Sequence, residues 1–99
     1  MFPGYTTKVS EESISLDTTI KPKSDVVHVT STATTTVVAT IAPPYGGFSG
    51  IMFLVNRSGG NVTTTTTGNI LAVTTVPNNL VCTFIYSKSL GKWCSAAIS

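Results

Sequence analysis

The chain has 99 residues and a net charge of +2, and only 10% of its residues are charged. A chain of this length forms one domain and leaves no room for a separate catalytic domain. Its six basic residues are scattered and make no dense basic stripe of the kind that displaces counterions, so we expect no nucleic-acid partner.

The composition favours strands. Thr is the commonest residue, and Val, Ile and Ala supply much of the apolar content. β-branched side chains suit a pleated sheet and crowd a helix. No stretch repeats apolar residues at helical spacing for three turns. We therefore expect an all-β protein with very little helix.

The first 23 residues differ from the rest of the chain. Phe2 and Tyr5 stand beside a Pro and a Gly, and two acids follow among Ser and Thr. We expect residues 1–23 to form an extended N-terminal arm, either a loose terminus or an arm whose Phe2 and Tyr5 bind in a groove of a neighbour. The alternation of Ile14 and Leu16 with polar residues predicts one short strand within it.

Residues 24–99 form the predicted β-sandwich domain. Alternating apolar residues predict a strand over 25–30, in which His28 lies on the opposite face from the valines beside it. A second strand over 35–41 follows so closely that we expect the two to form an antiparallel hairpin. A loop rich in Pro and Gly over 43–50 then separates two halves of the sheet.

The remaining strands define the expected fold class. Residues 51–55 are all apolar, which predicts a central core strand covered on both faces. Residues 62–67 are nearly all Thr and predict a weak, exposed strand. Turns rich in Gly, Pro and Asn separate three more predicted strands, over 70–76, 80–86 and 92–98. Short strands broken at such intervals are typical of a double sheet, so we predict an antiparallel, jelly-roll-like β-sandwich.

The sequence offers little for catalysis. His28 is the sole histidine, and its place in an alternating Val pattern indicates a structural strand residue. The acids all lie near the N-terminus: Glu11, Glu12, Asp17 and Asp25. No acid–base pair with a nucleophile can be assembled from these residues, so we expect the protein not to be an enzyme.

Metal, cofactor and membrane partners are not expected either. Cys82 and Cys94 are far apart, with His28 far upstream, which does not fit the close ligand pairs of a zinc site. The chain starts without a signal-peptide pattern, so reduced thiols are the expected state, although the sequence does not fix it. No apolar run approaches the roughly 20 residues that cross a bilayer.

Aromatic residues mark two regions as possible binding surfaces. Tyr45 and Phe48 in the Pro- and Gly-rich loop are either contact residues for a partner or caps on the end of the sandwich. Trp93 is either a contact residue or a core residue.

Several features together resemble a recurrent β-domain of tailed-bacteriophage virion proteins, which occurs in small capsid decoration proteins and in fibre tips. The resemblance lies in residues 25–30, 39–44, 50, 68–70, 84–86 and 92–93. Taken in order, they make a pattern of a hydrophobic strand, a Pro-containing loop, a core strand, a Gly-Asn-Ile turn and a Trp near the C-terminus. The resemblance spans roughly residues 22–95. It implies a sandwich or jelly-roll-like fold that assembles by symmetry, commonly as a trimer, and attaches to a larger shell without catalytic residues. Cys94 departs from it, because an aromatic or polar residue is expected after Trp93.

We therefore expect a capsid decoration or cement protein, which binds the outer surface of a shell built from the major capsid protein and stabilises it. Its other expected partner is itself, as a homotrimer, and its expected location is the virion, after synthesis in the host cytoplasm. The alternative is a receptor- or carbohydrate-binding tip domain of a tail or head fibre. In that case Tyr45, Phe48 and Trp93 would stack on sugars, and the loop with Asn56, Arg57 and Asn61 would supply polar groups.

Overall fold

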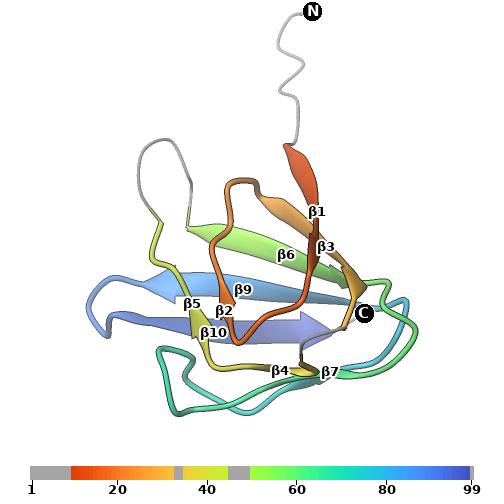
Figure 1. Cartoon of the computed structure of the whole chain (residues 1–99). Coiled ribbons are helices and arrows are strands. Elements are labelled where there is room, and N and C mark those ends of the chain that lie inside the picture. The colour runs from red at the N-terminus through yellow and green to blue at the C-terminus, as the bar shows by residue number, and fades with distance from the viewer. Residues whose placement is uncertain (1–9, 33–34, 45–49, 99) are drawn as a thin grey trace, which may run out of the picture.

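The computed structural model describes residues 10–32, 35–44 and 50–98. Within these ranges the chain forms ten strands and no helix, which confirms the expected all-β class (Figure 1). It follows that no described helix is long and apolar enough to cross a membrane.

The larger layer is a five-stranded sheet, in the strand order β1-β3-β6-β9-β10. Its strands are β1 (Glu11–Ser15), β3 (Val26–Ser31), β6 (Ile51–Asn56), β9 (Val81–Ser87) and β10 (Lys92–Ile98). β6 lies at the centre, as predicted for the apolar run at 51–55. Buried side chains alternate with more exposed ones along most of β3, β6 and β9, which is the period expected of a strand with one face in the core.

The second layer consists of two small sheets. One pairs β2 (Thr19–Ile20) with β5 (Thr40–Ile41), and the other has the order β4-β7-β8, built from β4 (Val37–Val38), β7 (Val62–Thr64) and β8 (Thr75–Val76). Both small sheets contribute side chains to the same hydrophobic cluster as the five-stranded sheet. The layers therefore enclose one core in a sandwich-like arrangement (Figure 1).

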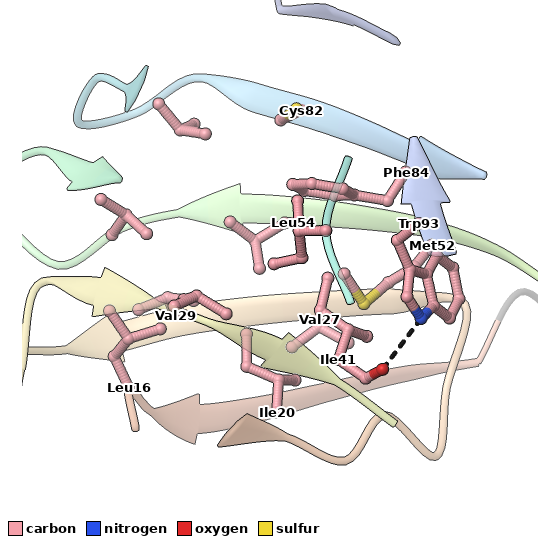
Figure 2. Packing of buried hydrophobic residues seen from close by; sticks show 14 residues of the cluster. Leu16, Ile20, Val27, Val29, Ile41, Met52, Leu54, Cys82, Phe84 and Trp93 are labelled. Atoms are coloured by element: carbon pink, nitrogen blue, oxygen red, sulfur yellow. Dashed lines mark hydrogen bonds between the residues drawn. The ribbon is translucent and has the colours of Figure 1, made fainter. Parts of the chain in front are cut away.

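Figure 2 shows this core in detail. The five-stranded sheet supplies alternate residues of its central strands, and Ile20, Ile41 and Val38 come from the second layer. Trp93 and Phe84 are the largest side chains that are fully buried. At about 25 cal/mol per Å² of apolar surface removed from water, such aromatic residues contribute strongly to the stability of a domain this small.

The expected antiparallel pairing is wrong for much of the fold. β3 does not form a hairpin with the next strand, but lies between β1 and β6 and runs parallel to both. The pairs β2–β5 and β4–β7 are parallel as well. Antiparallel pairing holds for β6–β9, β9–β10 and β7–β8. Hydrophobic alternation reports which face of a strand is buried and carries no information on strand direction, so the sequence pattern did not exclude parallel pairs.

Two predictions about exposure are also wrong. The Thr-rich segment is not an exposed edge, because β7 lies between β4 and β8, with Val62 and Thr64 buried. The buried hydroxyl of Thr64 donates to the carbonyl oxygen of Ala72 at 2.9 Å and accepts from the N–H of Thr74 at 2.9 Å. β6 is central as predicted, but only one of its faces is covered by other described residues.

The predicted N-terminal arm is folded into the domain from Ser10 onward. β1 pairs with β3 from Glu11, and β2 pairs with β5. Leu16 and Ile20, which lie in these two segments, are buried in the core. The short strand predicted near Ile14 is confirmed, whereas the boundary at residue 23 falls too late. Residues 1–9 lie outside the described residues.

Candidate interaction surface

The five-stranded sheet has an outer face that no other described strand covers. We define the outer face by the side chains that alternate with the buried ones: Glu11, Ser13, Val26, His28, Thr30, Ile51, Phe53, Val55, Val81, Thr83, Ile85, Lys92 and Cys94. Its centre is apolar. Ile51, Phe53 and Ile85 remain 41%, 39% and 47% exposed.

Strand register makes these apolar side chains contiguous. Ile51 lies directly opposite Ile85, which in turn lies opposite Cys94 on β10. Phe53 follows Ile51 on the same face of β6 and lies opposite Val26 on β3. Directly opposed residues in a sheet have Cβ atoms about 4.5–5.5 Å apart, so the apolar patch crosses at least four strands.

Charged groups lie at the edges of the outer face. Glu11 is on the edge strand β1, and its Oε1 lies 2.7 Å from Nε2 of His28 on β3. Lys92 is on the opposite edge strand, β10. An apolar centre with a polar rim is the usual anatomy of a protein–protein interface.

His28 is a strand residue on the outer face, as predicted, in line with Ser13 on β1 and Val55 on β6. Its acidic partner is not evident from the sequence, because Glu11 becomes a neighbour only through the parallel pairing of β1 with β3. The Nδ1 atom of His28 is buried and has no hydrogen-bond partner among the described residues.

The two cysteines are both free thiols. Cys82 is buried in the core, whereas Cys94 belongs to the outer face. Their side chains point to opposite faces of the sheet, which rules out a bond between them in this fold. Burial raises the pKa of the Cys82 thiol above its ordinary value. The expectation of reduced thiols therefore agrees with the geometry.

Asn56 serves the fold and does not face a sugar. It is fully buried at the end of β6. Its Nδ2 donates to the carbonyl oxygens of Gly60 at 2.7 Å and Val76 at 2.8 Å, and its Oδ1 accepts from the N–H and the hydroxyl of Ser58 at 3.1 and 2.7 Å. All four hydrogen-bonding positions of the amide are used, so none remains for a ligand.

The Gly-Asn-Ile turn and the late Trp meet in one junction. The Asn69 side chain bonds both backbone groups of Ile41, accepting from its N–H at 2.9 Å and donating to its carbonyl oxygen at 2.6 Å. Ile70 forms a bridge with Trp93 and is buried. A Cβ on Gly68 would overlap the backbone of Ala39, so the close approach of the two segments requires glycine.

The four residues predicted to contact a partner fall outside the described part of the chain. Phe2 and Tyr5 belong to residues 1–9, and Tyr45 and Phe48 belong to residues 45–49. Trp93, in contrast, is fully buried, which confirms the core interpretation and removes it as a sugar-stacking surface. In the described ranges, no group of three or more His, Cys, Asp or Glu side chains is placed to hold a metal ion.

Comparisons with known proteins find similarity among solved structures. A scan against protein families and a search of curated proteins find no match. The fold is similar to part of a chain in a solved structure of a chaperone–substrate complex, with a TM-score of 0.56 and 23% sequence identity over 95% of this chain. This chain spans only 18% of that chain. The similarity extends to the fold alone.

The outer face is the feature that sequence reasoning missed. The run Ile51–Val55 signalled it, because a strand that is apolar on both faces needs cover on both. We expected the chain itself to cover both faces, whereas the described residues cover only one.

Proposed function

We propose that this chain is a structural protein of a virus particle, a capsid decoration protein that binds the outer surface of the shell and stabilises it. The uncovered apolar face of the five-stranded sheet carries this proposal. Monomeric proteins rarely expose contiguous apolar patches larger than a few hundred Å², and larger ones mark contact surfaces. A domain with such a face is suited to assembly with other protein surfaces.

The resemblance to phage virion domains supports the same function. Two features that carry it, the Gly-Asn-Ile turn at 68–70 and Trp93, have a defined role here, because they connect β5 to the five-stranded sheet around Ile41. These residues are therefore fold determinants, which supports the proposal that the chain has this type of domain.

Decoration acts through many copies. Each contact with the shell is modest, and copies that are linked to one another gain avidity through effective concentration. In this proposal Phe2, Tyr5, Tyr45 and Phe48 contact the major capsid protein, because aromatic side chains next to glycine are effective contact residues.

The fibre-tip alternative receives less support. Of the groups assigned to sugar binding, Trp93 is buried in the core and Asn56 is buried with its amide fully hydrogen-bonded. Sugar recognition needs exposed aromatic faces and free polar groups beside them. The outer face offers apolar surface with few such groups.

The test is the copy number of this chain in purified particles of the virus that encodes it, measured by quantitative mass spectrometry against the major capsid protein. A copy number that scales with the capsid lattice supports decoration. A handful of copies per particle would indicate a tail or fibre protein, and absence from the particle overturns the virion function.

A further inference from the structure

We infer that the outer face of the five-stranded sheet binds the outer face of a second copy of this chain, as a symmetric dimer. This inference rests on the proposed function and names the partner that binds the same outer face. β6 carries apolar side chains on both of its faces, while the described residues cover only one of them. Parallel strands with such runs are normally covered on both faces, and β6 is paired in parallel with β3.

The charges of the outer face favour a second copy as the occupant. Glu11 lies on one edge strand and Lys92 on the other, with apolar side chains between them. A two-fold axis parallel to the strands places β1 of each copy over β10 of the other. The edge strand with Glu11 in one copy then lies over the edge strand with Lys92 in the other, so the two edges carry opposite charges, which the register places about four residues apart along the strands.

The area of the outer face matches a small interface between two copies. Strands lie about 4.8 Å apart and residues rise about 3.3 Å, so five strands of about six residues span roughly 24 by 20 Å. Two such faces remove on the order of 1,000 Å² in total, near the lower limit of about 1,200 Å² for a specific interface. The contact therefore has to use the whole face, and it gives a dimer of modest affinity.

Symmetry distinguishes this dimer from the trimer that the phage resemblance implies. Packing a surface onto its own copy is an isologous contact and closes after two subunits. A trimer requires two different surfaces that meet head to tail. Sheets that pack face to face lie about 10 Å apart with their strands inclined by about 30°, which the twist of this sheet allows.

The experiment measures the mass of the purified full-length chain across a dilution series by sedimentation equilibrium. We expect the mass to rise from 10.3 kDa toward twice that value as the concentration increases to about 100 μM, because an interface this small gives roughly micromolar affinity. Phe53→Lys and Ile85→Lys should each weaken the dimer at least tenfold, since each places a charge in the apolar centre. Phe53→Leu should retain it.

Val73→Lys and Leu90→Lys are the matched controls. Both residues are exposed apolar side chains outside the outer face, at 65% and 57% exposure. Circular dichroism verifies that each variant is folded. A monomer at every concentration, a trimer, or a dimer that survives both Phe53→Lys and Ile85→Lys would overturn the inference. These outcomes are independent of the particle copy number, so failure of the dimer and failure of the decoration function are separate results.

Discussion

The indole N–H of Trp93 donates a hydrogen bond of 3.0 Å to the carbonyl oxygen of Ile41 (Figure 2). Both residues are fully buried, and the bond joins the edge strand β10 of the large sheet to β5 in the second layer. Asn69 donates to the same oxygen. Asn69 and Trp93, which lie far apart in the sequence, thus both hold β5 of the second layer in place.

Replacement of Trp93 should destabilise the domain through lost packing more than through the lost hydrogen bond, because Asn69 still satisfies the Ile41 oxygen. We expect Trp93→Phe to lower the free energy of unfolding by about 1–3 kcal/mol and Trp93→Ala by about 3–5 kcal/mol. Urea denaturation followed by far-ultraviolet circular dichroism measures both. Tyr86→Phe is the control, since it keeps the ring that packs on Trp93 at a centroid distance of 5.3 Å. An unchanged Trp93→Phe protein would contradict the packing role.

Gly68→Ala should destabilise the fold by about 2 kcal/mol or more, because the added methyl group meets the carbonyl group of Ala39 and backbone has to move. Gly60→Ala provides the comparison, since nothing lies within 4 Å of a Cβ at that position. We expect Gly60→Ala to change the stability by less than about 0.5 kcal/mol. Equal effects of the two substitutions, measured by thermal unfolding, would show that close approach is not the reason for glycine at 68.

The features that sequence reasoning predicted are local ones. The alternation in Val26–Ser31 and the apolar run at Ile51–Val55 gave the positions of β3 and β6 and the buried face of β3. Turn residues located the β9–β10 hairpin. Strand direction was not predictable, because the parallel crossovers that bring β1, β3 and β6 together depend on how the second layer packs, and no residue pattern records that.

The candidate site was missed for the same reason. Whether Phe53 contacts another part of the chain or solvent depends on how many layers the fold has, and the apolar pattern is the same in both cases. The Glu11–His28 pair likewise depends on parallel register, which places residues 17 positions apart side by side.

His28→Gln should leave folding and assembly nearly unchanged. Among the described residues, His28 has one polar contact, with the exposed carboxylate of Glu11, and a contact with such a solvent-exposed group contributes little. We expect the free energy of unfolding to change by less than about 0.5 kcal/mol, and the dimerisation constant by less than about threefold. Urea denaturation and sedimentation equilibrium measure the two quantities. A large loss in either would give His28 a role beyond strand packing.

The two thiols should differ sharply in reactivity. In the monomer at high dilution, a thiol reagent at neutral pH should modify Cys94 on the outer face within minutes and Cys82 only as fast as the core opens. Cys94→Ser should abolish the fast phase, and Cys82→Ala should leave it intact. Equal rates for the two thiols would contradict the burial of Cys82.

Cys82 should also make stability depend on alkaline pH. Because burial raises the pKa of its thiol, the unfolded chain loses this proton at a lower pH than the folded one. The contribution of Cys82 to stability is therefore complete below the unfolded pKa of about 8.5 and falls as the pH rises through the higher folded pKa. Urea denaturation of the wild type and of Cys82→Ala from neutral to alkaline pH measures it, and only the wild type should show this decline.

Asn56→Asp tests whether the buried amide acts as a hydrogen-bond donor. The substitution keeps the shape, but it points a carboxylate oxygen at the carbonyl oxygens of Gly60 and Val76, to which Asn56 donates. We expect a loss of about 3–5 kcal/mol at neutral pH, the range for an uncompensated buried charge. Asn61→Asp, at an exposed position of the same loop, should cost less than about 0.5 kcal/mol.

The pH dependence separates charge from shape. Burial raises the folded pKa of the introduced carboxyl group, so the part of the loss that comes from the charge should be absent below the unfolded value of about 3.9 and should grow as the pH rises through the folded pKa. A protonated carboxyl group also restores one donor, which narrows the gap to the wild type in acid. Urea denaturation at neutral and at acid pH measures the gap. The same loss of stability at both pH values would mean that only the fit of the side chain matters at this position. The two hydrogen bonds that Asn56 donates would then not stabilise the end of β6.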